Sequence, residues 1–337
     1  MQRSTQIGIS LIALFAATGF NSDAVEAAGV SGSECTLSGA LAGGGLWGDQ
    51  SYNYVVNDGA SDQSDWQSLF VEASGLVTCN AANFQIDYAH YGHESDFGNK
   101  DQFSNKNEGD PFYGISGLDN KTTDAGVQHY GGAIFWRDPN MNAFGLSGSF
   151  IRQASDLWLY DIRNDYYRGG LFAEYYPTER MTMGGSVHYF HADSDIWGKD
   201  FADHNGVEFA AYAKFYPIPQ MSLNVRGDYM LDATPKNKGI EVNGYAITAE
   251  VEYEIWNKGL VLTGGARYAN RQLGDTGDSF EITDKQVFAG IKFYFSANGA
   301  KSLQERDRTG SYDNTSTMLE KLPHHWGSLG AAVNIAN

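Results

Sequence analysis

The feature that most constrains the fold is an alternation of apolar and polar residues with a period of two. Between Tyr245 and Ile255 every odd-numbered residue is apolar, whereas Glu250, Glu252 and Glu254 occupy even positions. Successive side chains of a β-strand point to opposite faces, so this pattern predicts a strand with one apolar face. Similar or weaker alternation predicts eleven more strands, at 37–47, 69–77, 84–88, 126–136, 144–150, 167–175, 183–189, 207–215, 221–229, 260–268 and 287–295.

The connections between these strands alternate in length. Short ones rich in Pro, Gly, Asn and Asp, residues that favour tight turns, lie at 80–83, 138–140, 177–180, 217–219 and 257–259. Longer ones lie at 48–65, 94–124, 154–163, 194–204, 231–240 and 271–283. The strands should therefore form hairpins with tight turns at one end and long loops at the other. We expect loop 94–124, the longest, to fold over or into the mouth of the barrel.

This asymmetry predicts an all-β fold, an antiparallel transmembrane β-barrel of about 12 strands. Such barrels have short periplasmic turns, long extracellular loops and an even number of strands. In hydrocarbon every backbone N–H and C=O must be paired within the protein, which strands achieve only by closing into a barrel. A soluble β protein also alternates apolar and polar residues and is the alternative, although its loop lengths need not alternate.

Aromatic residues on the apolar faces fall near both predicted ends of the barrel, as expected for interfacial girdles. Those near the short turns are Phe84, Tyr175, Phe215, Tyr253 and Phe295, and those near the long loops are Tyr189, Tyr229, Tyr245 and Tyr268.

The last strand, 286–295, resembles the closing strand of Gram-negative outer-membrane β-barrel proteins. Gly290, Phe293 and Phe295 match the glycine, alternating aromatic and terminal phenylalanine of that pattern. The resemblance covers about 36–296 and is porin-like. It implies that these three residues act as an assembly signal, that the barrel-assembly machinery and outer-membrane lipid are partners, and that the protein resides in the outer membrane.

The polar faces predict a charged lumen. The predicted pore-lining residues are Glu72, Asp87, Arg168, Glu174, Glu208, Lys214, Arg226, Asp228, Glu250, Glu252, Glu254, Arg267 and Lys292. Because burying unpaired charges costs several kcal/mol each, these side chains must face water or pair across the lumen. Twelve strands suggest a narrow aqueous pore, with a closed, salt-bridged lumen as the alternative.

The overall charge argues against one class of partner and favours another. The 337 residues carry a net charge of −18, and the six long loops hold 20 acidic and 8 basic residues. Nucleic acid is therefore not an expected partner, since phosphate binding needs basic patches. The acidic mouth and lumen predict small hydrophilic solutes or cations instead.

Three further segments complete the predicted organisation. Residues 1–27 have the charged start, apolar stretch and small-residue end of a signal peptide. The barrel occupies 36–296, and 297–337 is predicted to be a periplasmic C-terminal extension, with a lumen plug as the alternative. Cys35 and Cys79 both fall at the periplasmic end of adjacent strands, where an oxidising compartment favours a disulfide over two free thiols.

Motifs for catalysis, metal binding and cofactors are weak. The pairs His90/His93 and His188/His191 are three residues apart, so on a strand they point to opposite faces and cannot share a metal. Ser186 and His188 share a face, but it is the inward one. We predict no enzyme, no metal and no cofactor, and a porin-like channel for passive diffusion with mild cation preference. A structural or surface-interaction barrel with a closed lumen and a lipid or peptide hydrolase are the alternatives.

Overall fold

The computed structural model describes residues 35–54, 61–96, 122–157, 160–196, 199–232, 241–256, 258–275, 278–296 and 302–321. The predicted signal peptide and most of the predicted loop 94–124 lie outside these residues, as does the end of the chain after Lys321. Across the part of the chain that the structure describes, no helix is both long and apolar enough to cross a membrane.

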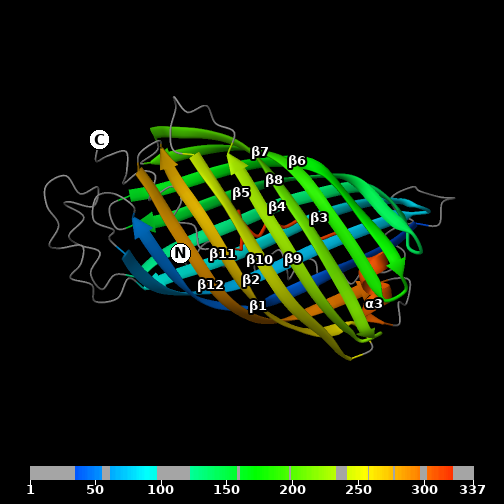
Figure 1. The fold of residues 1–337 in the computed structure, drawn as a ribbon. Helices are drawn as coiled ribbons and strands as arrows, with labels where there is room; N and C mark the ends of the chain where they lie inside the picture. Colours follow the sequence, from blue (N-terminus) through cyan, green and yellow to red (C-terminus); the bar gives the residue numbers. More distant parts are fainter. Residues whose placement is uncertain are drawn as a thin grey trace, which may run out of the picture.

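The described residues form a closed antiparallel barrel, which confirms the predicted fold class (Figure 1). The strands are β1 (Cys35–Tyr54), β2 (Ser61–Cys79), β3 (Ala82–Asp96), β4 (Thr122–Asp138), β5 (Asn142–Leu157), β6 (Tyr160–Thr178), β7 (Met181–Ile196), β8 (Lys199–Ile218), β9 (Met221–Asp232), β10 (Glu241–Trp256), β11 (Leu260–Asp275) and β12 (Asp278–Ser296). Each strand pairs with its sequence neighbours, and β12 pairs with β1 to close the sheet, so no edge is left open.

The strands are longer than the alternation predicted. The predicted loops 154–163, 194–204 and 271–283 are mostly strand, because β5 pairs with β6, β7 with β8 and β11 with β12 almost to the ends of their hairpins. The predicted bounds of these three loops were wrong, and so were those of loop 48–65, where β1 pairs with β2 as far as Asn53 and Ser61. Polar residues close to the rim alternate less clearly than membrane-level residues, so the pattern ends before the ladder of hydrogen bonds does.

The opposite ends of these hairpins are tight turns, as predicted. Asn80, in the turn between β2 and β3, has φ 56°, and Gly259, between β10 and β11, has φ 97°. Asparagine and glycine are the residues that adopt this left-handed region most readily. A Cβ on Gly259 would also lie 2.3 Å from the carbonyl oxygen of Tyr294, so this turn admits no larger residue without a shift.

The outer surface of the barrel is apolar. Leu69 and Ile86, for example, expose 75% and 61% of their surface. Aromatic residues of both predicted girdles, including Phe84, Tyr189 and Tyr253, are exposed on the same surface. So large a continuous apolar surface is not stable in water but matches the hydrocarbon band around a transmembrane barrel.

The barrel interior contains the C-terminal segment, which differs from the predicted periplasmic extension. Helix α3 (Leu303–Thr309) lies at the short-turn end, where the backbone N–H of Gln304 donates to the carbonyl of Pro219 at 3.3 Å (Figure 1). Residues 310–321 then continue without a further helix or strand, and Met318 and Leu319 are buried. The described part of the tail therefore occupies the lumen.

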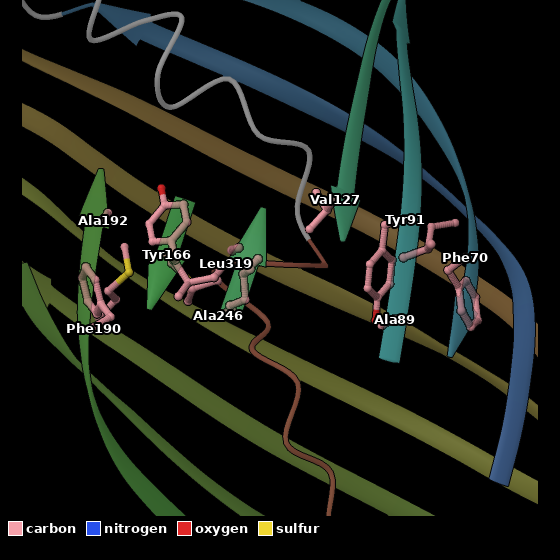
Figure 2. Packing of buried hydrophobic residues seen from close by; sticks show 14 of the residues in the cluster. Phe70, Ala89, Tyr91, Val127, Tyr166, Phe190, Ala192, Ala246 and Leu319 are labelled. Atoms are coloured by element: carbon pink, nitrogen blue, oxygen red, sulfur yellow. The ribbon is translucent and has the colours of Figure 1, made fainter. Parts of the chain in front are cut away.

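Met318 and Leu319 sit within a ring of inward-facing apolar side chains, which we call the apolar collar (Figure 2). Its members on the wall are Leu46, Trp66, Phe70, Ala89, Tyr91, Val127, Ile151, Tyr166, Phe190, Ala192, Met230, Ala246, Ala269 and Ile282. They come from eleven of the twelve strands, so the collar surrounds the lumen almost completely. The inner face is thus not uniformly polar.

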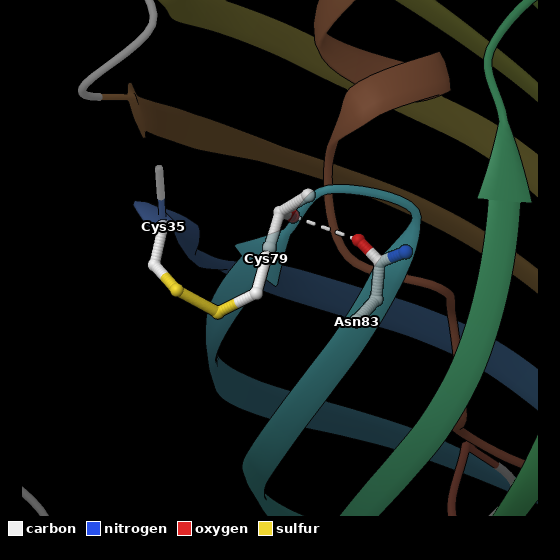
Figure 3. Close-up of a disulfide and its surroundings, with 4 residues drawn as sticks. Cys35, Cys79 and Asn83 are labelled. Atoms are coloured by element: carbon white, nitrogen blue, oxygen red, sulfur yellow. Dashed lines mark hydrogen bonds between the residues drawn. A yellow bond between two sulfur atoms is a disulfide. The ribbon is translucent and has the colours of Figure 1, made fainter. Parts of the chain in front are cut away.

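A disulfide joins Cys35 at the start of β1 to Cys79 at the end of β2, as predicted (Figure 3). The two residues are direct register partners in the β1–β2 ladder. Beside the bridge the hydroxyl of Thr78 donates to the side-chain carbonyl oxygen of Asn83 at 2.7 Å. The bridge closes the whole first hairpin, a sequence separation of 44 residues.

Breaking this bridge should destabilise the barrel without changing its fold. For a closed loop of this length we expect Cys35→Ala to lower the free energy of unfolding by about 2–4 kcal/mol. Urea titration in detergent micelles measures this change, and the Cys35→Ala/Cys79→Ala double variant is the control. It should lose no more than the single variant. An unchanged midpoint would mean that hairpin pairing alone fixes this end of the barrel.

Candidate functional site: the occupied lumen

The thirteen predicted pore-lining residues all lie on strands whose alternate side chains point into the barrel. Most of them contact either the tail or one another. Glu252, for instance, accepts from Lys214 at 3.2 Å and from Lys292 at 3.0 Å. Their inward position follows from strand parity. Their role in lining a conducting pore is a separate matter and remains a prediction.

In the first region the tail contacts the wall through Asp307 of helix α3. We call Asp307 and its wall partners the latch. Its carboxylate accepts from Lys214 Nζ at 2.9 Å, from the Tyr216 hydroxyl at 3.0 Å and from the Tyr294 hydroxyl at 2.9 Å. One helical turn is thereby fixed to strands β8 and β12. Three charge-assisted or phenolic donors on one carboxylate form a strong, directional anchor.

A second ion pair and several backbone contacts support the latch. Arg306 Nη2 lies 3.2 Å from Glu254 Oε1, with both side chains almost fully buried. Arg308 donates to the carbonyls of Thr178 and Met181 in the β6–β7 turn. Such buried charges are stable only when they are paired, so the helix and the short-turn end of the lumen are matched to each other.

The middle region centres on Tyr312 and Asp313. The ring of Tyr312 stacks on Phe172 with centroids 3.7 Å apart. The Asp313 carboxylate lies 3.3 Å from Arg226 Nη1 and 3.7 Å from Lys321 Nζ, and it borders a cavity inside the barrel.

The charge of Asp313 is favoured by these partners. Enclosure in the lumen would by itself raise the pKa of Asp313, whose side chain borders the cavity, but Lys321 and Arg226 outweigh that effect and hold this pKa well below its usual value of 3.8. A carboxyl whose pKa is lowered in the docked state stabilises docking at any pH above its pKa in the undocked chain. This stabilisation is lost only as the pH falls below that undocked pKa. This ion pair is therefore complete at neutral and mildly acidic pH.

The third region joins the tail to the wall just below and within the apolar collar. Glu320 Oε1 lies 2.9 Å from His129 Nδ1, and both side chains are fully buried. The hydroxyl of Ser316 donates to Glu208, which also pairs with Arg168 at 3.1 Å. Above these polar contacts, Met318 and Leu319 close the collar with aliphatic and thioether groups.

Space remains beside the tail on one side of the lumen. A cavity of about 190 Å³ lies between the tail and the wall, bordered by Glu72, Glu174, Glu250, Lys292 and Asp313 among others. It can hold several water molecules, since one water needs far less volume. The wall charges that the tail does not contact therefore face a polar space, not protein packing.

Sequence reasoning missed several interior residues. Arg137 donates to the carbonyl of Gly310 at 2.5 Å, and Arg271 pairs with Asp284 at 2.5 Å with both side chains fully buried. Residues two apart on a strand share a face. Arg137 therefore faces inward with Phe135, and Arg271 faces inward with Arg267, so the sequence could have placed both arginines inside. The partners in the tail could not have been found in this way, because they lie more than 100 residues away from Arg137.

The hydrogen-bond partner of His188 is Ser147 and not Ser186, the residue with which it shares a strand face. His188 Nε2 lies 2.7 Å from the hydroxyl of Ser147 on β5, and both residues are buried beneath the tail. A substrate could reach them only after the tail had moved. Among the described residues no three His, Cys, Asp or Glu side chains are grouped closely enough to hold a metal ion.

The proposed assembly-signal residues lie on β12 next to the closing seam. Gly290 is the register partner of Gly44 on β1, and Phe293 is exposed on the outer surface. Phe295 pairs in register with Gly39, where a Cβ would lie 2.4 Å from the Phe295 ring. Gly39 thus makes room for the terminal aromatic residue. The role of these residues in assembly remains a prediction.

No protein-family model matches the sequence, and no curated protein is similar enough to match it. Solved structures do match. The chain is similar to the toluene transporter TodX of Pseudomonas putida, with 11% identity over 77% of this chain and 89% of that chain and a TM-score of 0.40. It is also similar to the translocator domain of the autotransporter NalP from Neisseria meningitidis, with 11% identity, 87% and 96% coverage and a TM-score of 0.39.

A third structure is the outer membrane protease OmpT from Escherichia coli, with 12% identity, 77% and 97% coverage and a TM-score of 0.32. These structural neighbours are outer-membrane β-barrels of Gram-negative bacteria, the group that the last strand resembles. The likeness concerns the barrel architecture alone.

Weakening the latch should loosen the tail. In Asp307→Asn the charge that faces Lys214 is lost, and we expect docking to weaken by about 2 kcal/mol. Hydrogen–deuterium exchange of peptides covering 303–321 should accelerate by roughly 30-fold, while exchange in the barrel strands stays unchanged.

The matched control is Glu305→Gln, which removes an acidic charge from the exposed side of the same helix. It should leave exchange of the tail within about twofold of the parent. Equal acceleration in both variants would show that the helix responds to net charge and not to the Asp307 contacts.

Proposed function

We propose that the protein is an outer-membrane channel of a Gram-negative bacterium for small hydrophilic solutes, with mild cation preference, and that its own tail closes it. In this proposal, residues 302–321 are the closing element. The proposal assigns transport, not catalysis, to the barrel.

The observation that carries the proposal is that a separate segment of the chain occupies the space that the side chains of the wall leave in the lumen. The tail meets the wall largely through charged and polar groups, such as Asp307 with Lys214 and Asp313 with Arg226. These groups would be solvated by water if the tail left. A wall with so many charges is compatible with an aqueous pore, whereas an apolar core would collapse or aggregate.

The apolar collar supports the same proposal. Ions cross narrow apolar constrictions poorly, because such constrictions lose their water. With Met318 and Leu319 inserted, most of the collar is buried, while Leu46, Phe70 and Tyr91 border a small cavity of about 70 Å³ beside Lys321. The seal is therefore placed where a few apolar side chains of the tail have the greatest effect on conduction.

Deleting 302–337 should open the channel. We expect the truncated protein to give discrete, ohmic current steps in planar lipid bilayers, while the full chain is closed for most of the recording time. The truncation ends shortly after Phe295, so the closing strand remains intact. A truncated barrel that is folded, as judged by circular dichroism and resistance to detergent unfolding, but does not conduct would contradict the proposal.

Cation preference should depend on acids that border the cavity. Glu250 accepts from Thr263 at 2.7 Å and faces the cavity. In the truncated barrel, Glu250→Gln should move the reversal potential in a KCl gradient toward zero, because one fixed negative charge is lost from the pathway. Asp193→Asn, at an exposed site near the rim of β7, is the control and should change the potential less. An unchanged reversal potential in Glu250→Gln would argue against selectivity by lumen charge.

A structural barrel with a permanently closed lumen is the second candidate. The fully buried pair Arg271–Asp284 favours it, because a paired charge within the wall resembles the packed interior of a closed barrel. The conductance of the truncated protein separates the two candidates.

A further inference from the structure

Many of the contacts that hold the tail are directed at its backbone. Between Gly310 and Lys321, side chains of the wall donate hydrogen bonds to six main-chain carbonyls. The donor and the carbonyl are, in order, Arg137 and Gly310, Gln85 and Tyr312, Arg168 and Asn314, Arg226 and Thr315, Gln153 and Leu319, and Arg267 and Lys321. The donors come from six strands, so they follow the tail around and along the lumen.

In one of these contacts a single wall side chain binds both backbone polar groups of one tail residue. Gln85 Nε2 donates to the carbonyl of Tyr312 at 2.6 Å, and the backbone N–H of Tyr312 donates to Gln85 Oε1 at 2.7 Å. A side-chain amide that pairs in this way with one residue's N–H and C=O imitates a neighbouring strand. It recognises any non-proline residue in an extended conformation, whatever its side chain.

The donors are held in place by the wall itself. Arg168 uses Nη1 on Glu208 at 3.1 Å and offers Nη2 to the tail. Arg226 uses Nε on Asp228 at 2.9 Å and offers Nη2 to the carbonyl of Thr315 at 3.0 Å.

Arg267 follows the same arrangement. Its Nε donates to the hydroxyl of Thr248 at 3.1 Å, while Nη1 reaches Gln286 at 2.7 Å and the carbonyl of Lys321 at 3.1 Å. Because one part of each of these three guanidinium groups is bound to the wall, the other part should remain directed into the lumen when the tail leaves. Preorganised donors of this kind lower the cost of binding.

The side-chain contacts add a preference for particular residues, since Glu320 meets His129, Ser316 meets Glu208 and Asp313 meets Arg226. The apolar collar accepts Met318 and Leu319, and flexible apolar surfaces of this type accept other aliphatic or aromatic groups of similar size. The cavity beside Tyr312 and Asp313 leaves room for side chains larger than those of the tail.

From these contacts we infer that the lumen is a binding site for short peptides without regular secondary structure, and that the tail is a tethered ligand of this site. This inference rests on the proposed function for its consequence, namely that peptides are among the solutes that enter the barrel. Binding itself requires only the folded barrel. The lumen recognises the peptide backbone through its six donors, and the collar prefers an apolar pair near one end of the ligand.

The test uses the barrel lacking 302–337, purified in detergent, and three fluorescently labelled probes. These are a synthetic peptide of residues 310–321, a scrambled peptide of the same composition, and maltohexaose as a non-peptide solute of comparable length. Fluorescence anisotropy should show binding of the first peptide, weaker binding of the scrambled peptide within about a hundredfold of it, because its backbone contacts remain while its side-chain pairs are lost, and no binding of maltohexaose. The same peptides should block current in bilayers in the same order.

A matched pair of barrel variants tests the contact set. Gln85→Glu replaces the donor that faces the Tyr312 carbonyl with a second acceptor, and it should weaken both peptides by about tenfold. Gln67→Glu, on the exposed face of β2, changes the same atoms outside the lumen and should leave both affinities unchanged.

Two results would overturn the inference: no binding of either peptide, or binding of the 310–321 peptide with the scrambled peptide more than about a hundredfold weaker, which would indicate a site dedicated to one sequence. A truncated barrel that conducts but binds no peptide refutes this inference and leaves the proposed function intact. A truncated barrel that binds both peptides but never conducts refutes the proposed function and supports the inference.

Discussion

The structure depends on one constraint, that a charged inner wall and an apolar outer wall are made by the same strands. Backbone closure satisfies the peptide groups, and the outer apolar residues match hydrocarbon. Neither satisfies the charges inside. They are balanced by ion pairs within the wall, by the tail and by a polar cavity, as Lys214 illustrates by contacting both Glu252 and Asp307.

The tail solves a problem of geometry as well as of charge. A barrel of this size has a lumen too wide for its own side chains to fill and too narrow for a folded domain. A short helix followed by an irregular segment that ends in a turn fits such a space. The helix fills the short-turn end, and the turn at 317–320 reaches the apolar collar, where the carbonyl of Leu319 accepts from the wall.

The sequence allowed the barrel to be predicted because its evidence is local. Alternation within 245–255 and the position of turn residues require only neighbours along the chain. The collar was less accessible, since in β4 both faces carry apolar residues: Val127 points inward and Ile134 outward. When both faces of a strand are apolar, the alternation no longer indicates which face points to the lumen and which to the lipid.

The sequence left a lumen plug as the alternative for the tail but favoured a periplasmic extension, for a different reason. Its acids and bases are balanced, a composition typical of a solvated extension. The residues that make Asp307 and Glu320 interior groups, Lys214 and His129, are far away in the sequence. Only the closed barrel brings them together, so long-range charge matching, without any local motif, determines where the tail lies.

The most direct test of this account is the accessibility of a thiol placed at Ser316. This tail residue is fully buried and its hydroxyl donates to Glu208 on the wall. In intact cells, Ser316→Cys should resist a small water-soluble maleimide until the barrel is denatured, whereas Glu305→Cys, on the exposed side of α3, should react promptly. Equally rapid labelling of both positions would mean that the segment lies free in the periplasm, and the closed lumen described above would be contradicted.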